Sequence, residues 1–149
     1  MTIEEAIRQK KPFRNEYQRV TVNLLYTSAF VREQIKKQLK PFNITLQQYN
    51  VLRILNGAGK PLSTSDIRDR LLDKMSDTSR MVDRLLEKEL VVRKLCPADK
   101  RLVDISLSRK GKALMKKISA IDEKLDAIPS NLTPEEARQL NDLLDKLRG

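Results

Sequence analysis

The chain has 149 residues, which is long enough for one domain with a sizeable hydrophobic core. Charged residues make up 34% of it and aromatic residues 4%, which favours a helix-rich protein, and the formal net charge is +10. One Cys and no His exclude a disulfide within the chain and argue against a metal site or a cofactor. No apolar run approaches the roughly 18–20 residues of a membrane span, and the N-terminus lacks the apolar core of a signal peptide, so we expect a cytoplasmic location.

The first 44 residues predict a short helix followed by a long one. Thr2 and Glu5 have the capping-box spacing of a helix start. From about Glu16 to Lys40, apolar residues recur with helical period in two stripes, which is more than a one-sided surface helix needs. The two stripes are Val20, Leu24, Val31, Ile35 and Leu39, and Val22, Leu25, Tyr26, Ala29 and Phe30. We therefore expect this helix to pack on its own domain and on a second partner.

Three shorter helices are predicted between residues 45 and 90. Thr45 with Gln48, and Ser63 with Asp66, have capping-box spacing and mark two helix starts. Another helix is predicted to begin near Ser76, after a short connection. Two short helices with a tight connection favour a helix-turn-helix.

The rest of the chain predicts a hairpin and two helices. Residues 91–95 and 102–107 alternate as the two strands of a hairpin. After Ser108, apolar residues are spaced by four and three, as in a heptad seam suited to packing against another long helix. This seam consists of Leu114, Ile118, Ile121, Leu125 and Ile128. Pro129 ends that helix, and the sequence TPEE at 133–136 predicts the start of the last one.

Together these elements predict the fold class. We expect a mainly α protein with a small β-hairpin, organised as a single domain over residues 1–149. The order helix, helix, hairpin favours a winged helix-turn-helix core at 45–107. Long helices at 1–44 and 108–149 flank that core and are expected to serve dimerisation.

The positive charge is concentrated in one segment. Residues 92–117 contain nine Lys and Arg against two Asp, whereas residues 118–149 contain four Lys and Arg against seven Asp and Glu. A localised basic patch attracts polyanions such as nucleic acid. A solvated face that aids solubility is an equally open interpretation of the charge alone.

The segment DRLLEKELVVRKLCPADKRLVDISLSRKGKAL, which starts at Asp83, resembles the signature of the MarR family of bacterial transcriptional regulators. The signature has Asp-x-Arg in the wing, here Asp99 and Arg101, then a Leu-Ser pair at 107–108 and a Gly at 111. The resemblance covers most of the chain. It implies a homodimer whose first and last helices interlock and whose two winged modules lie on one face of double-stranded DNA.

One position departs from the family pattern. The family usually has Gly after the recognition helix, in a KGLV turn, whereas this chain has KELV with Glu89 at that place. A residue other than Gly in a left-handed cap costs about 1 kcal/mol. We therefore expect the helix end to differ in shape here without a change of fold.

The helix predicted near Ser76 supplies the candidates for base and phosphate contacts. Arg reads guanine through O6 and N7, and hydroxyls at a helix start bind phosphates or base edges. The candidates are Ser76, Thr78, Ser79, Arg80 and Arg84. An alternative makes Ser76 a cap and Arg84 a surface partner of Asp83 or Glu87, so we expect roughly two or three of the five to contact DNA.

Two further groups are candidates for contacts with the DNA backbone. Ser63, Thr64 and Ser65 lie at a helix start that could bind phosphate, although capping is the expected main role of Ser63. In the wing, Lys100 and Arg101 are the expected contacts, and Asp99 is expected to hold Arg101 or close the turn. The cations after the hairpin are expected near the same backbone. They are Arg109, Lys110, Lys112, Lys116 and Lys117.

Cys96 raises the question of a redox switch. Arg93, Lys94 and Lys100 are close in sequence and would lower the pKa of its thiol. With no second Cys in the chain, a resolving thiol would have to come from another chain. A small strand residue without a redox role is the favoured interpretation.

These observations favour a sequence-specific DNA-binding regulator, expected to repress transcription as a homodimer on an inverted repeat. The lack of a nucleophile motif argues against an enzyme. A winged module that binds protein or RNA without operator specificity is the other alternative. The resemblance implies a small aromatic effector in a cleft, for which Tyr17, Tyr26, Phe30 and Tyr49 are the available aromatics unless they belong to the core.

Overall fold

The protein is described by a computed structural model covering residues 1–95, 97–99 and 103–149. The predicted roles of Cys96, Lys100 and Arg101 lie outside these described residues. The chain divides into two compact units, one formed by residues 1–37 with 127–149 and the other by residues 38–126. The single-domain organisation and the bounds of the winged core stay predictions.

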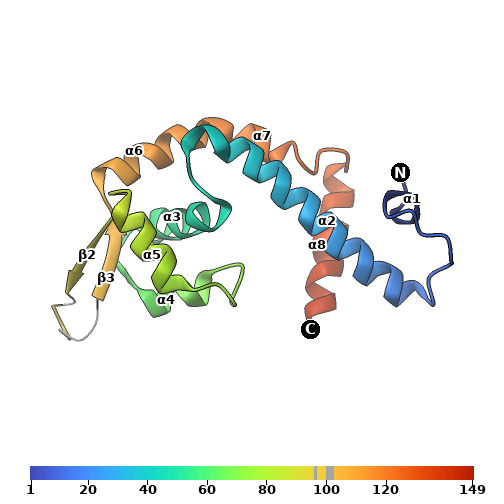
Figure 1. Ribbon diagram of the computed structural model, residues 1–149, viewed down its shortest axis with the longest axis horizontal. Helices are drawn as coiled ribbons and strands as arrows, with labels where there is room; N and C mark the ends of the chain where they lie inside the picture. The colour runs from blue at the N-terminus through green and yellow to red at the C-terminus, as the bar shows by residue number, and fades with distance from the viewer. Residues whose placement is uncertain (96, 100–102) are drawn as a thin grey trace. The chain divides into compact units, whose positions relative to one another are not determined.

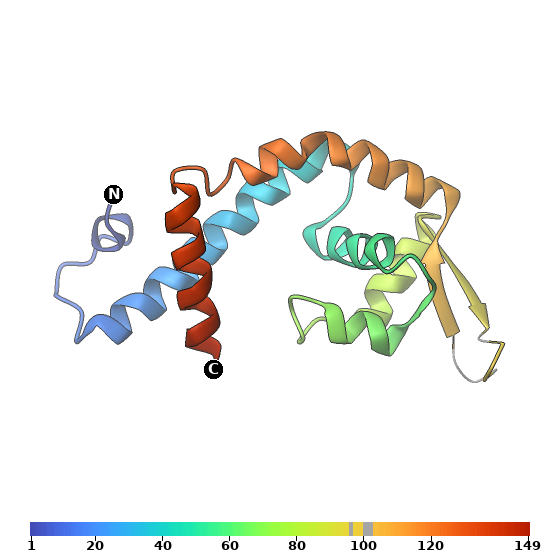
Figure 2. The same ribbon diagram turned by 180° about the vertical axis from the view of Figure 1, so that it is seen from behind.

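The second unit is a winged helix (Figure 1). Its elements are η1 (Lys40–Phe42), α3 (Leu46–Ala58), β1 (Leu62–Ser63), α4 (Thr64–Arg70), α5 (Thr78–Glu87), β2 (Val91–Leu95), β3 (Val103–Leu107), α6 (Arg109–Ile118), η2 (Ser119–Ile121) and α7 (Asp122–Asp126). Helix α3 lies between α6 on one side and α4 on the other, and both opposed views show this order (Figures 1 and 2). The predicted fold class, mainly helical with a small antiparallel sheet, is confirmed.

The sheet has three strands rather than the two of a hairpin. Strand β3 is central, and both β1 and β2 pair with it antiparallel in the order β1-β3-β2. The third strand, β1, contributes only Leu62 opposite Ile105 and Ser63 opposite Asp104. A two-residue strand shows no alternation, so the sequence pattern could not predict it.

The core of this unit is aliphatic. Its most deeply buried side chains come from the last residue of α2 (Glu16–Leu39), from α3, α4, α5 and α6, and from the sheet. They are Leu39, Val51, Leu52, Leu62, Ile67, Val82, Leu85, Ile105 and Ile118. Burial of such side chains at about 25 cal/mol per Å² of apolar surface is the main source of stability here. The helix pair α4–α5 is thereby fixed on α3 and the sheet.

Helix starts follow the predicted capping boxes closely. The reciprocal side-chain and backbone hydrogen bonds form at Thr2, Thr45, Ser63 and Thr133. The helix expected near Ser76 instead begins at Thr78, because the Asp77 carboxylate accepts a hydrogen bond from the Arg80 amide at 3.1 Å. The interpretation of Ser76 as the cap is therefore wrong.

The turn after α5 keeps a left-handed residue although that residue is Glu89, with φ of 60°. The Leu90 amide donates to the Leu85 carbonyl at 3.0 Å, and the Glu89 amide to the Leu86 carbonyl at 2.9 Å. These two bonds form a Schellman motif, which normally favours Gly at the left-handed position. The expected change of shape at this helix end is thus not found.

Helix α6 approaches this turn closely. A Cβ added to Gly111 would lie 2.0 Å from the Leu90 carbonyl oxygen. The Ser108 hydroxyl accepts from the Gly111 amide at 2.9 Å and donates to the Glu89 carbonyl at 2.6 Å. Gly111 is therefore required by the approach of two backbones, as the close packing of protein interiors leaves no space for a methyl group.

The predicted heptad seam is only partly buried. Within the described residues of the second unit, Ile118 and Ile121 are buried, whereas Leu114 and Leu125 are half-buried. Met115, which the seam omitted, is buried instead of Leu114. The helical path ends at Asp126, three residues before Pro129.

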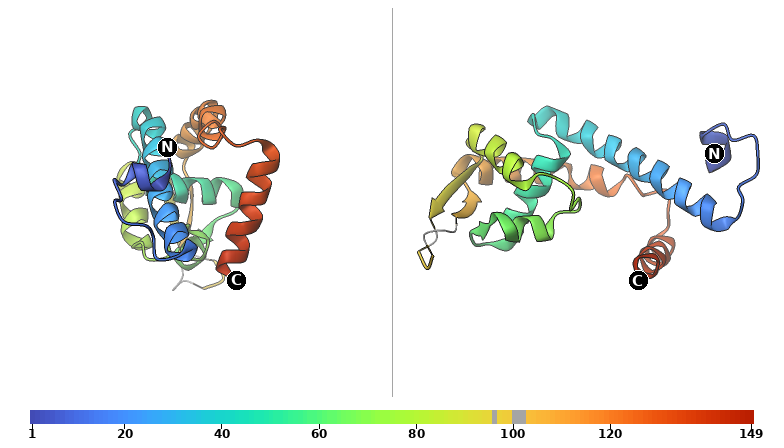
Figure 3. Two further views of the ribbon diagram at one scale, coloured as in Figure 1. Left: turned by 90° about the vertical axis from the view of Figure 1, so that its right-hand side faces the viewer. Right: turned by 60° about the horizontal axis from the view of Figure 1, so that its bottom comes forward.

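The first unit contains α1 (Ile3–Ala6), α8 (Pro134–Arg148) and most of α2 (Glu16–Leu39), which is one continuous helix (Figure 3). The Arg19 guanidinium donates to the Glu4 carboxylate at 2.7 Å and holds the pKa of that carboxyl below its usual range. Large apolar side chains of this unit are exposed. They are Tyr17, Val20, Leu25, Tyr26 and Phe30 of α2 and Leu140, Leu143 and Leu147 of α8.

The described residues contain neither a membrane-spanning helix nor a cluster of potential metal ligands. None of the described helices is long and apolar enough to cross a membrane. Likewise, no three His, Cys, Asp or Glu side chains of the described ranges gather as a metal site would need.

We predict that Gly111→Ala lowers the free energy of unfolding by about 1–3 kcal/mol, since the added methyl group overlaps the Leu90 backbone and one of the two segments must shift. Urea denaturation measures this change. Gly57→Ala is the matched control, because nothing lies within 4 Å of its added Cβ in α3, and it should stabilise the protein by up to about 1 kcal/mol. Equal effects of the two variants would contradict the packing argument.

Candidate nucleic-acid interface

Helices α4 and α5 form the helix-turn-helix, and α5 has one buried and one exposed face. Val82 and Leu85 are buried on the inner face, at 1% and 0% exposure. The exposed face consists of Ser79, Arg80, Asp83, Arg84 and Glu87. These positions recur every three or four residues, which places them along one side of the helix.

Thr78 is the exception among the predicted contacts. Its side chain is 1% exposed, and its hydroxyl has no hydrogen-bond partner among the described residues. A buried side chain does not reach a base or phosphate, so the structure removes Thr78 from the candidate contacts. The error arose because helical spacing alone does not show that the first turn of α5 faces the core.

The arginine candidates on α5 are exposed and available. Within the described part of the chain, neither Arg80 nor Arg84 forms an ion pair. The alternative in which Arg84 pairs with Asp83 or Glu87 is therefore contradicted. Asp83 instead binds Arg93 of β2, with 2.8 Å between the guanidinium Nη2 and the carboxylate Oδ1.

Arg93 was missed as a residue of this surface. The sheet register places Arg93 opposite the buried Ile105, so its side chain leaves β2 on the same side as the core. Val91 lies two residues earlier on that side and is buried. The alternation of the VVRKL segment indicates that Val91 and Arg93 share one face of the strand. The partner of Arg93, however, depends on where α5 lies.

The wing tip is described only in part. Asp99 is half-buried, and its predicted role in holding Arg101 or closing the turn stays a prediction. Lys100 and Arg101 lie outside the described residues. Their predicted contacts with DNA also stay predictions.

The cations of α6 do not lie beside the wing tip. Helix α6 starts from the opposite end of β3 to the segment 97–99 (Figure 1). The Lys110 ammonium donates to the Lys88 carbonyl at 3.1 Å, on the turn after α5. The expectation that the α6 cations lie near the same DNA backbone as the wing stays a prediction.

The start of α4 is organised by its cap. The Ser63 hydroxyl accepts from the Asp66 amide at 3.0 Å, and hydrogen bonds from Ser63 lower the pKa of the Asp66 carboxyl. Capping is thus the observed role of Ser63. Thr64 is half-buried and Ser65 is exposed, and their phosphate contacts stay predictions.

The four aromatic candidates for an effector cleft are dispersed. Tyr26 and Phe30 line a small cavity of about 160 Å³ against α1. Tyr17 is on α2 but outside this cavity, with 82% of its surface exposed. Tyr49 lies on α3 of the second unit, where burial raises the pKa of its hydroxyl and the Asp122 carboxylate adds to the rise.

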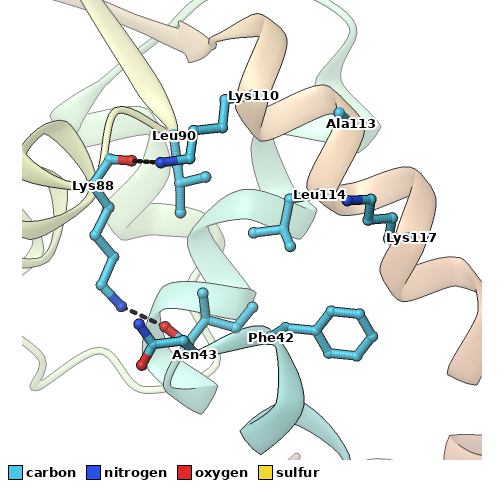
Figure 4. A pocket seen from close by; sticks show the side chains of 9 residues that line it. Phe42, Asn43, Lys88, Leu90, Lys110, Ala113, Leu114 and Lys117 are labelled. Carbon is cyan, nitrogen blue, oxygen red and sulfur yellow. Dashed lines mark hydrogen bonds between the residues drawn. The ribbon is translucent and has the colours of Figure 1, made fainter.

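A larger cavity of about 340 Å³ lies within the second unit, between residues 42–44 ahead of α3, the turn after α5, and α6 (Figure 4). Its lining residues are Phe42, Asn43, Ile44, Lys88, Leu90, Lys110, Ala113, Leu114 and Lys117. Three of them are lysines and none is acidic. The Lys88 ammonium donates to the Asn43 carbonyl at 2.6 Å and to Gln48 Oε1 at 3.0 Å.

Known proteins match this chain in sequence. Residues 42–102 match the family model described as "MarR family". The HTH-type transcriptional regulator FarR of Neisseria gonorrhoeae is 28% identical over 137 residues, which cover 91% of this chain and 93% of FarR.

Solved structures match the fold. A crystal structure of a mutant MarR from E. coli complexed with operator DNA is 26% identical, with a TM-score of 0.83 over 92% of this chain and 99% of that chain. The organohalide-sensing regulator RdhR-CbdbA1625, in its 2,4-dichlorophenol-bound form, is 20% identical with a TM-score of 0.82, covering 94% and 86% of the two chains.

We predict that Thr78→Val raises the free energy of unfolding by about 1 kcal/mol, because it replaces a buried hydroxyl without a partner by a methyl group of similar size. Chemical denaturation measures the change, and DNA affinity should stay the same. Ser79→Ala, at the exposed neighbouring position, is the control and should alter stability by less than about 0.5 kcal/mol. A loss of DNA affinity in Thr78→Val at unchanged stability would return Thr78 to the interface.

Proposed function

Because this chain belongs to the MarR family of DNA-binding transcriptional regulators, we propose that it represses transcription as a homodimer bound to an inverted-repeat operator. The observation that carries the proposal is the exposed face of α5, where Arg80 and Arg84 are unpaired among the described residues. Helix α5 itself contacts the wing strand β2. Exposed Arg side chains on a helix of this type read base edges in the major groove. The proposed place of action is the cytoplasm, where operator DNA would be met.

The homodimer is supported by the apolar surface of the first unit. Leu25 of α2 is 69% exposed, and Leu143 and Leu147 of α8 are 63% and 57% exposed. Contiguous apolar surface on helices marks interaction sites. We propose that a second copy of the chain covers these helices, which serve dimerisation.

An effector is the second part of the proposal. The 340 Å³ cavity is lined by apolar side chains, among them Phe42, Ile44 and Leu114, and by three lysines. Figure 4 shows the labelled lysines Lys88, Lys110 and Lys117. This combination suits a small aromatic molecule that carries a negative charge. The binding of 2,4-dichlorophenol by the structural neighbour RdhR-CbdbA1625 agrees with an aromatic effector. Effector binding beside Lys88, at the end of α5, would relieve repression by displacing that helix.

The alternative is a winged module that binds RNA or protein without operator specificity. Footprinting and competition distinguish the two functions. We expect protection of two half-sites with centres one DNA turn apart, about 34–36 Å, and weak competition by RNA.

The variant Leu143→Glu tests the dimer in the same assay. It should sediment as a monomer at micromolar concentration and lose the paired footprint, since a charge would be placed in an apolar interface. A wild-type monomer, or protection of one asymmetric half-site, would argue against the proposed assembly.

Removal of the Arg84 side chain and removal of the Arg101 side chain are predicted to affect DNA binding differently. Arg84→Ala should cost about 1–3 kcal/mol per half-site and relax the preference at one base position. Arg101→Ala, on the wing, should weaken specific and nonspecific binding together and flatten the salt dependence by roughly one unit per half-site. Asp99→Ala should reproduce part of the Arg101 effect if Asp99 holds Arg101 in place. Unchanged affinity and salt slope in Arg101→Ala would remove the wing tip from the mechanism.

A further inference from the structure

The ion pair between Asp83 and Arg93 joins the proposed recognition helix α5 to the wing strand β2. The Nη2 to Oδ1 distance is 2.8 Å, and the side chains are 60% and 47% exposed. The pair therefore lies on the outer surface of the second unit, beside Arg80 and Arg84 on the same exposed face of α5.

The sheet positions Arg93 for this contact. Cross-strand partners in an antiparallel pair have their side chains on the same face, so Arg93 shares a face with Ile105, which is 0% exposed. The next residue, Lys94, is opposite Asp104 on the other face. Arg93 is thus the described cation of β2 that is directed toward α5.

The exposed face of α5 carries both positive and negative side chains. The exposed face of α5 has two cations, Arg80 and Arg84, and two anions, Asp83 and Glu87. A carboxylate on a surface that faces DNA phosphates weakens binding. A cation that is engaged by such a carboxylate is, in addition, not available to a phosphate.

We propose that Asp83 is a specificity-determining residue that withholds Arg93 from the DNA backbone and so limits sequence-independent affinity. The inference rests on the proposed function, because it requires α5 and β2 to face DNA. Asp83 acts here through Arg93 and needs no base contact of its own. The ligand whose affinity it limits is any duplex DNA, through its phosphates.

The size of the effect follows from counterion release. Each phosphate neutralised on B-DNA changes the slope of log K against log salt by about 0.9, which corresponds to about eightfold in affinity at 0.1 M salt. Release of Arg93 should therefore add about one contact per protomer. An exposed ion pair contributes little to folding stability, so variants of the pair should remain folded.

The experiment measures binding of the full chain to a random-sequence duplex across a salt series. Asp83→Ala should steepen the slope by about 0.9 per protomer and raise affinity at 0.1 M salt about eightfold for each protomer that contacts the duplex. Glu87→Ala is the matched control, since it removes one exposed negative charge from the same face and Glu87 has no ion pair within the described residues. Its slope should stay near that of the wild type.

Two further variants test the role of Arg93. The double variant Asp83→Ala with Arg93→Ala should lose the steepening, because the released cation is absent. Asp83→Glu retains a carboxylate for Arg93 and should keep the wild-type slope. Thermal unfolding checks that each variant is folded, and Asp83→Asn replaces Asp83→Ala if the latter is not.

The outcomes separate this inference from the proposed function. Equal slopes for Asp83→Ala and Glu87→Ala on DNA that both proteins bind would overturn the role of Asp83 alone. Steepening that persists in the double variant, or that Asp83→Glu reproduces, would also overturn it. A wild-type protein without affinity for any duplex would overturn both proposals together.

Discussion

The contact between the Leu90 carbonyl and the Cα of Gly111 is the constraint on which the winged unit depends. Leu90 lies between the end of α5 and the start of β2, and Gly111 lies in the first turn of α6. Around this contact, the Ser108 amide donates to the Leu90 carbonyl at 3.1 Å, and the Ser108 hydroxyl donates to the Glu89 carbonyl. The exposed helix, the wing and α6 are therefore fixed to one another at a single turn. The same bonds account for a left-handed Glu89, since an overdetermined backbone tolerates a residue that costs about 1 kcal/mol in isolation.

The features that the sequence predicted are those that depend on neighbouring residues. A capping box needs only four residues, and the one at Ser63 with Asp66 formed as expected. The unpredicted features depend on residues distant in sequence. The burial of Thr78 depends on packing of the first turn of α5, and the pairing of Asp83 with Arg93 depends on strand register together with helix position. The two-residue strand β1 is defined entirely by β3, because it has no pattern of its own.

The cationic side chains of this protein form groups that have different surroundings. The arginines of α5 are exposed on a helix face of near-neutral charge. Lys88, Lys110 and Lys117 instead surround an apolar cavity at the other end of that helix. The net charge of the sequence predicted attraction to polyanions. It did not distinguish the two groups of cations, because the position of a residue along α6 does not show which side of the sheet its side chain occupies.

The amide oxygen of Gln48 connects the exposed helix α5 to α3. This buried oxygen accepts from the Thr45 amide at 3.1 Å and from the Lys88 ammonium at 3.0 Å, so the start of α3 and the end of α5 share one acceptor. The same ammonium also binds the carbonyl of Asn43, which has a left-handed backbone with φ of 54°. The Lys88 side chain therefore links the backbone at Asn43 and the start of α3 directly to the end of α5. The end of α5 is thus tethered by one polar side chain, in addition to the aliphatic packing of Val82 and Leu85.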